Sequence, residues 1–326
     1  MKILGGDKIL EAAKFYAKRH PQDLPSKTVT DVYNELLDAK AKDGASDVYL
    51  RDLRYRLARF SAAFRCSFAN VTAREINDFL RSLEVTGRSR NNYRTSILTL
   101  FSFAESSGYL PKDHVDINDV SRAKEANSAI EIFTPDEMVK LLAAAQLNPD
   151  DLQPGWNIRY ATTQRLLPFL ALGAFAGLRT AEIQRQLWSD INLERGFIRV
   201  TAAKGNTAQK RLAPVSENLK KWLSPCWQNE GSCCDYAKLP AAIARLADRA
   251  GVAWKHNALR HSFISYRVAL TQNIPQVSLE VGNSVQMINR HYRELVTEGE
   301  AKEWFGIVPK LPSNIIAAPL RVGESA

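Results

Sequence analysis

The sequence lacks the features that mark membrane, secreted and zinc-stabilised proteins. No apolar run approaches the ~20 residues of a membrane helix, so we expect no membrane partner. Asp7 and Lys8 interrupt the N-terminal segment, where a signal peptide would carry its apolar core, and this predicts a cytoplasmic protein. The cysteines form no CxxC pair and no Cys/His quartet, so neither a disulfide framework nor a metal site is expected; they are Cys66, Cys226, Cys233 and Cys234.

Acidic residues are too few to balance the basic ones. The chain has 35 acidic residues against 44 lysines and arginines, which gives a formal net charge of +9. A basic surface neutralises phosphates and releases their counterions, so the imbalance favours a polyanionic partner, although a merely basic protein has the same composition. The length of 326 residues is enough for two domains.

Helical periodicity dominates residues 28–110. Apolar residues recur there at spacings of three and four and predict two amphipathic helices, one with Leu50, Leu53, Leu57, Phe60 and Phe64 and one with Tyr93, Ile97, Leu100, Phe101 and Ala104. This segment therefore predicts a small helical bundle. A short helical lead-in at 1–27 precedes it, and a polar linker at 111–132 follows it.

Residues 133–310 predict a second, mostly helical domain with a small β-hairpin or sheet, followed by a tail at 311–326. Two capping boxes mark helix starts in it, one formed by Thr134 and Glu137 and one by Thr297 and Glu300.

A buried helix and a hairpin lie between these two starts. The apolar segment 165–175 predicts the helix, and segments 196–201 and 210–215 predict two strands whose turn carries Lys204. The whole pattern predicts a mainly α, α+β protein.

Three separated motifs carry residues suited to phosphodiester chemistry. They are Gly177-Leu178-Arg179-Thr180-Ala181-Glu182, Ala258-Leu259-Arg260-His261-Ser262-Phe263, and Gly282-Asn283-Ser284 followed by Tyr292. A guanidinium group presents a planar fork that grips two phosphate oxygens, and a phenol can attack phosphorus as a nucleophile. Glu182 lies three residues after Arg179, on the same helical face, where it can pair with the guanidinium.

This order of two arginines and a late tyrosine resembles the tyrosine recombinase (phage integrase) family over residues 28–310. The resemblance implies that Arg179 and Arg260 stabilise the phosphate charge while Tyr292 forms a 3′-phosphotyrosyl link. It implies that Lys204 protonates the departing 5′ oxygen and that Glu182 orients Arg179. Because the covalent link conserves the phosphodiester energy, no metal or nucleotide cofactor is implied.

Two positions depart from the family pattern. The family usually has histidine three residues before the second arginine and histidine or tryptophan nine residues before the tyrosine, where this chain has Asn257 and Asn283. Amides can donate hydrogen bonds to phosphate but cannot exchange protons near neutral pH, and a lost general acid–base typically costs about 10²–10⁴-fold in rate. Whether Lys255 or the out-of-register His256 compensates is open, and His261 is structural in the family more often than catalytic.

The resemblance also implies the fold and the partners. The first domain would be a helical core-binding (SAM-like) domain and the second a catalytic domain of the DNA breaking-rejoining type. A homo-tetramer on two double-stranded DNA sites, with accessory DNA-bending proteins, would carry out site-specific recombination or integration for a mobile element at the nucleoid. The expected DNA contacts are the basic clusters, formed by Arg88, Arg90, Asn91, Arg94, Lys210 and Arg211.

Two other functions fit the same residues. The two asparagines favour a catalytically degenerate DNA-binding protein that keeps the recombinase fold, whereas the intact tyrosine, lysine and arginines oppose it. A type IB topoisomerase-like enzyme shares the covalent tyrosine chemistry but relaxes supercoils as a monomer. By analogy we also expect the C-terminal helix with Trp304 and Phe305 to dock on a neighbouring protomer; the alternative is that these rings pack within their own chain.

Overall fold

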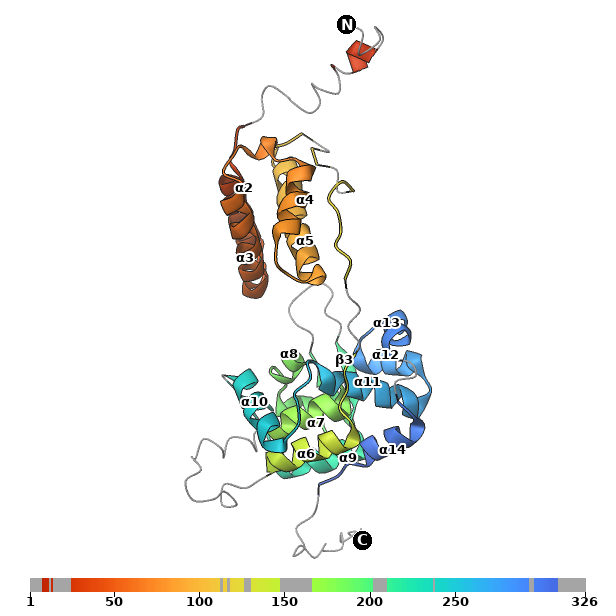
Figure 1. Ribbon diagram of the computed structural model, residues 1–326. Coiled ribbons are helices and arrows are strands. Elements are labelled where there is room, and N and C mark those ends of the chain that lie inside the picture. The colour runs from red at the N-terminus through yellow and green to blue at the C-terminus, as the bar shows by residue number, and fades with distance from the viewer. Residues whose placement is uncertain are drawn as a thin grey trace, which may run out of the picture. The chain divides into compact units, whose positions relative to one another are not determined.

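The chain is organised as two compact units, Met1–Ser128 and Ala129–Ala326. The computed structural model describes residues 8–11, 13, 25–111, 114–115, 118–125, 130–146, 166–201, 210–236, 238–292 and 296–309. Figure 1 colours the first unit red to yellow and the second yellow-green to blue. The boundary between the units falls within the predicted linker 111–132. Most of the predicted lead-in, and all of the predicted tail, lie outside the described residues.

Within residues 25–111 of the first unit there are four α-helices, and a serine or threonine precedes each of them. They are α2 (Val29–Lys42), α3 (Asp47–Ala63), α4 (Ala73–Ser82) and α5 (Gly87–Ser106). The side chains of the four N-cap residues accept hydrogen bonds from backbone N–H groups that the first helical turn leaves unpaired. Their apolar faces share one buried core that contains most of the two predicted stripes, among them Leu57, Phe60, Ile97 and Leu100.

The segment after the bundle is not a free linker. Val120 is buried in the core of the first unit. The amide of Asn91 bonds both backbone groups of Ala123, at 3.0 and 2.8 Å, and Asn77 donates to the carbonyl of Asp119 at 2.7 Å. Residues 118–125 therefore belong to the first unit, although their polar composition predicted a linker.

The second unit is built around one fully buried helix. This is α7 (Leu167–Ala176), whose ten residues are all buried, as its apolar sequence predicts. Around it lie α6 (Pro135–Gln146), α8 (Thr180–Ile183), α9 (Glu217–Leu223), α10 (Leu239–Ala250), α11 (Ala258–Thr271), α12 (Ile274–Val281), α13 (Val285–Tyr292) and α14 (Glu298–Gly306). Both predicted capping boxes are present, at the starts of α6 and α14. None of the described helices is long and apolar enough to cross a membrane.

A small antiparallel sheet completes the second unit. Its strands are β1 (Ile191–Asn192), β2 (Phe197–Val200) and β3 (Arg211–Pro214), in the order β1-β2-β3. Phe197 pairs with Pro214 and Val200 with Arg211. The two strands therefore lie within the predicted segments and pair with each other. The short β1 was not predicted. The mainly α, α+β class is confirmed.

The last helix packs against its own chain (Figure 1). Trp304 has 0% of its surface exposed, stacks on Tyr266 at a centroid distance of 4.4 Å and donates from Nε1 to the carbonyl of Ala174 at 3.0 Å. The ring of Phe305 meets Phe263 edge-on. The expectation that Trp304 docks on a neighbour is therefore wrong, because this side chain is fully buried within its own unit.

Candidate active site

The end of α7 turns sharply and brings Arg179 out of the core. Gly177 ends the helix with a left-handed φ of +65°, and a Cβ at this position would lie 2.4 Å from the ring of Phe263. Only glycine fits this turn. Arg179 then stands at the start of α8, where its backbone N–H donates to Glu182 at 2.8 Å and its Nη1 donates to the same carboxylate at 2.9 Å. The side chain of Arg179 remains 46% exposed.

Arg260 reaches the same place from within the protein. It lies on α11 and is buried, and its guanidinium donates to the carbonyl of Gly177 and, at 2.6 Å, to the carbonyl of Val281. Burial and the nearby charge of Arg179 lower the pKa of Arg260 to about 9. The group is therefore still a cation at neutral pH, held by the buried carbonyls at the ends of α7 and α12.

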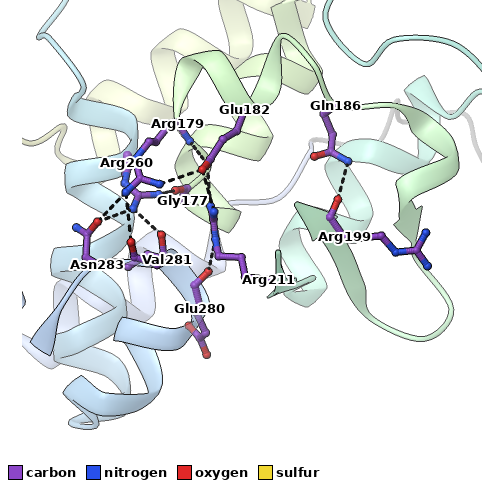
Figure 2. A network of polar contacts seen from close by, with 11 residues as sticks. Gly177, Arg179, Glu182, Gln186, Arg199, Arg211, Arg260, Glu280, Val281 and Asn283 are labelled. Atoms are coloured by element: carbon purple, nitrogen blue, oxygen red, sulfur yellow. Dashed lines mark hydrogen bonds and ion pairs between the residues drawn. The ribbon is translucent and has the colours of Figure 1, made fainter. Parts of the chain in front are cut away.

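Asn283 joins the two arginines. Its Oδ1 accepts hydrogen bonds from Nη2 of Arg179 and from Nη2 of Arg260, both at 2.9 Å (Figure 2). The amide stands just after Gly282, which ends α12 with a φ of +67°. Two guanidinium groups therefore converge on one oxygen atom at this point.

Glu182 is the buried centre of a second, adjoining set of contacts. Arg211 on β3 grips it through two parallel bonds, of 2.8 and 2.7 Å, and also donates from Nε to the carbonyl of Glu280 at 3.0 Å. Figure 2 shows Glu182 between Arg179 and Arg211. Burial alone would raise the pKa of Glu182, but the hydrogen bonds from Arg211 and Arg179 outweigh it and lower the pKa to about 2.

Tyr292 is attached to this site through its neighbour on α11. It is the last residue of α13 and is 5% exposed, and its hydroxyl oxygen lies 2.6 Å from Nδ1 of His261, the residue after Arg260. Burial raises the pKa of Tyr292, and the charges of Arg260 and Arg179 act against that increase. Burial and the positive charge of Arg260 lower the pKa of His261. A neutral phenol and a neutral imidazole therefore face each other near pH 7.

A cavity of about 330 Å³ opens beside the arginines. Arg179, Arg260 and Asn257 line its polar side, and its other walls are mostly apolar side chains of α7, α8 and α10. Asn257 has a left-handed φ of +56° at the start of α11 and is exposed. The structure thus brings six of the seven predicted catalytic residues to one region: Arg179, Glu182, Asn257, Arg260, Asn283 and Tyr292. The seventh, Lys204, lies outside the described residues.

The alternatives to Asn257 are placed differently. Lys255 donates to both oxygens of Glu137, at 2.8 and 2.6 Å, and to the carbonyl of Ile132 at 2.9 Å, so its ammonium group is already engaged. His256 lines the cavity and is exposed. Among the described residues no group of three or more His, Cys, Asp or Glu side chains is arranged to hold a metal ion.

The predicted DNA contacts divide into outward and inward side chains. The side chain of Arg88 is 81% exposed, and Lys210 is exposed. Asn91 is buried, and Arg94 donates from Nε to the carbonyl of Val120 at 2.7 Å. Arg211 is committed to Glu182, as described above. Asn91, Arg94 and Arg211 thus hold parts of the protein together, and a simple reading of residue type does not reveal this.

Two contributors to the site were missed in the sequence. Arg211 was assigned to DNA because it sits in a basic hairpin, and His261 was set aside as structural. The only local signal for His261 is its position directly after Arg260, which places its side chain about 100° around the helix from the arginine.

Comparison with solved structures identifies the fold. No family model matches this sequence, and no curated protein matches it. A lambda integrase dimer bound to a COC′ core site is 18% identical over 91% of this chain and 85% of its own, with a TM-score of 0.64. A lambda integrase tetramer bound to a Holliday junction is 15% identical over 88% of this chain and 84% of its own, with a TM-score of 0.62.

A third similar structure comes from another recombinase. XerH site-specific recombinase, bound to palindromic difH substrate as a post-cleavage complex, is 19% identical over 85% of this chain and 83% of its own, with a TM-score of 0.58. At these identities the likeness concerns the fold. The chain has the tyrosine recombinase fold.

Proposed function

We propose that this protein is a site-specific DNA recombinase that cleaves and rejoins DNA through a 3′-phosphotyrosyl intermediate. The observation that carries the proposal is the convergence of Arg179 and Arg260 on one oxygen, that of Asn283, within a recombinase fold. Two guanidinium groups that share one acceptor in this way form a binding site for an anionic oxygen.

This binding site suits a non-bridging oxygen of a phosphate. In the DNA complex such an oxygen would take the place of Oδ1 of Asn283 between the two Nη2 atoms, because a charged acceptor forms stronger hydrogen bonds than an amide. The NH₂ group of Asn283 could then donate to the same phosphate, and the exposed Asn257 could donate from the start of α11. Both asparagines thereby support charge stabilisation, and neither supplies proton transfer.

The reaction follows from these positions. The phenolic oxygen of Tyr292 attacks the phosphorus, the bond to the 5′ oxygen breaks, and the two guanidinium groups stabilise the charge that builds on the non-bridging oxygens. Lys204, which lies between β2 and β3 in the sequence, protonates the departing 5′ oxygen. Attack by the 5′ hydroxyl of a second duplex on the phosphotyrosine then exchanges strands.

We further propose that the working assembly is a homo-tetramer on two double-stranded DNA sites. The similar structures of lambda integrase include a dimer on a core site and a tetramer on a Holliday junction, which supports this assembly. The net charge of +9 suits a polyanionic partner such as duplex DNA. The same proposal includes DNA bending by accessory proteins, integration of a mobile element and association with the nucleoid.

The proposal can be tested without a known target sequence. The full chain is incubated with fragmented duplex DNA that includes the sequences flanking its own gene, and then denatured. Wild type should retain DNA attached at a 3′ phosphate, whose partner end carries a free 5′ hydroxyl, whereas Y292F should retain none. Equal recovery with the two proteins would contradict the proposal.

A native gel and a plasmid relaxation assay, run beside the covalent capture, separate the two alternatives. A catalytically degenerate DNA-binding protein would shift DNA in a native gel but leave none attached after denaturation. A type IB topoisomerase-like enzyme would relax any supercoiled plasmid as a monomer, without regard to sequence. Asn257 and Asn283 are the observation that keeps the first alternative in view.

A further inference from the structure

A histidine that the family pattern does not use contacts the nucleophile. Nδ1 of His261 lies 2.6 Å from the hydroxyl oxygen of Tyr292, and the two rings are tilted by 33° with centroids 5.7 Å apart. Within the described part of the chain, no other side chain forms a hydrogen bond with this hydroxyl. The contact joins α11, which holds the phosphate arginine Arg260, to the last residue of α13.

The direction of this hydrogen bond follows from its surroundings. The groups that face His261 are Arg260 beside it, His256 before α11, and His291 and Tyr292 on α13, and the first three can all carry positive charge. Burial and these charges lower the pKa of His261, whereas burial raises the pKa of Tyr292. Near neutral pH the phenol therefore keeps its proton and donates it to Nδ1, and the imidazole proton resides on Nε2.

We propose that His261 is the general base that accepts the phenolic proton when Tyr292 attacks DNA. This role rests on the proposed function, since it needs the phosphotyrosyl reaction. As the bond between the tyrosine oxygen and phosphorus forms, the O–H bond breaks and its proton moves to Nδ1. The bond from phosphorus to the 5′ oxygen breaks, and that oxygen keeps the electron pair of the broken bond and receives a proton from Lys204. In the rejoining step the imidazolium returns its proton to the tyrosine oxygen.

The other candidates for this role are placed less well. Asn257 and Asn283 are amides, which cannot accept a proton near neutral pH. The ammonium group of Lys255 is engaged by Glu137. His291 directly precedes Tyr292 on α13, so its side chain leaves the helix about 100° away from the tyrosine. His261, four residues after Asn257 and about one helical turn further along α11, thus supplies the imidazole that the chain lacks at Asn257.

The decisive variant is H261N, because an asparagine oxygen can accept a hydrogen bond near the position of Nδ1 but cannot take the proton. The substrate is the duplex recovered by covalent capture with wild type, and the readout is the rate of covalent complex formation. We expect H261N to lose about 10²–10⁴-fold in rate while binding the duplex as wild type does. The matched control H291Q should react at the wild-type rate.

Two further readouts separate a proton acceptor from a structural residue. The wild-type rate should fall at acidic pH, because protonated His261 cannot accept a proton, and H261N should lack this decrease. A duplex with sulfur in place of the bridging 5′ oxygen releases a thiolate that needs no proton. This duplex should therefore restore the cleavage rate of K204A but not that of H261N. In the DNA-free protein, side-chain ¹⁵N spectra should show Nδ1 of His261 without a proton.

Each outcome is informative. H261N at the wild-type rate or faster, rescue of H261N by the sulfur duplex, or a proton on Nδ1 in the free protein would overturn the role of His261 and leave the recombinase proposal standing. Failure of wild type itself to form any covalent complex would overturn the proposed function, and this role with it.

Discussion

Arg211 and Glu182 form a two-bond ion pair, at 2.8 and 2.7 Å, that ties strand β3 to the helix start carrying Arg179. The side chain of Arg211 is 11% exposed and that of Glu182 is 9% exposed, so water screens this pair little. Glu182 also accepts from the backbone and the side chain of Arg179. Strand β3 is therefore connected, through one carboxylate, to Arg179.

Removing Arg211 should destabilise the second unit. R211A leaves the buried carboxylate of Glu182 with one partner fewer, and breaking a buried pair from one side typically costs about 3–5 kcal/mol. R211K should recover only part of this, because an ammonium group cannot form both parallel bonds. All six tryptophans lie in the second unit, so tryptophan fluorescence during urea unfolding reports this unit alone.

A matched surface pair provides the control. Arg199 and Asp190 are 3.7 Å apart, and the arginine is 59% exposed. Exposed pairs contribute about 0–1 kcal/mol, so R199A should leave the unfolding midpoint nearly unchanged. If R211A unfolds at the same urea concentration as R199A, the buried pair does not stabilise the fold.

The same carboxylate predicts how stability depends on pH. Its pKa is lowered in the folded state from the ordinary 4.5 to about 2, so the stability it contributes is fully present above 4.5 and is lost as the pH falls towards 2. That difference corresponds to about 3 kcal/mol. E182Q should therefore be less stable than wild type at pH 7 and should lose less stability between pH 4.5 and pH 2. Urea unfolding across this range measures both curves, and parallel curves would contradict the assignment.

Substitutions of Arg179 and Arg260 should separate cleavage from binding if the proposed function is correct. R179A and R260K each remove one hydrogen-bond donor from the point where Oδ1 of Asn283 now sits, and loss of one such donor typically costs about 10²–10³-fold in rate. We use lysine for Arg260 because the buried carbonyls of Gly177 and Val281 would otherwise lose their donor. The rate of covalent complex formation measures the effect, and a native gel measures binding. A loss of affinity as large as the loss of rate would mean that the arginines only bind DNA.

Arg51 and Arg54 are additional candidates for DNA contacts in the first unit. Arg88 pairs weakly with Glu125 at 3.4 Å and Arg90 donates to the carbonyl of Leu83, whereas Arg51 and Arg54 on α3 are exposed and form no ion pair with any described residue. Each neutralised phosphate contributes about 0.9 to the slope of log affinity against log salt. R51A/R54A should thus reduce that slope by about 2 and R88A/R90A by less. The reverse order would restore the original assignment.

Several features of the fold were predictable because their causes are local. The capping boxes of Thr134 and Thr297 need only a hydroxyl and a carboxylate three residues apart, and both are present. The order of Arg179, Arg260 and Tyr292 was likewise visible in the chain. The contacts that Asn283 and His261 make with these residues depend on how α8, α11 and α13 pack together. The spacing of residues in the sequence does not predict that packing.

The features that were missed depend on register and on distant partners. In β3 the charged Arg211 points inward to Glu182, while the apolar Leu212 is 58% exposed, which reverses the usual alternation of a half-buried strand. A reader of residue types alone places the arginine on the surface. The same holds for Asn91, which is polar but buried because its amide pairs with the backbone of Ala123.

The cis packing of α14 predicts the outcome of truncating the chain. Trp304 is fully buried and bonded to Ala174, so W304A should destabilise the second unit by about 3–5 kcal/mol, as for other buried aromatic residues. K302A, which removes only an exposed pair with Glu298, is the control. Far-UV circular dichroism during urea unfolding measures the stability of both variants.

Deletion from Thr297 onward should unfold this unit, because the rings of Trp304 and Phe305 complete its core. DNA cleavage should then be lost because the unit is unfolded. A deletion variant that stays folded as a monomer but fails to assemble on DNA would instead show that α14 acts between protomers.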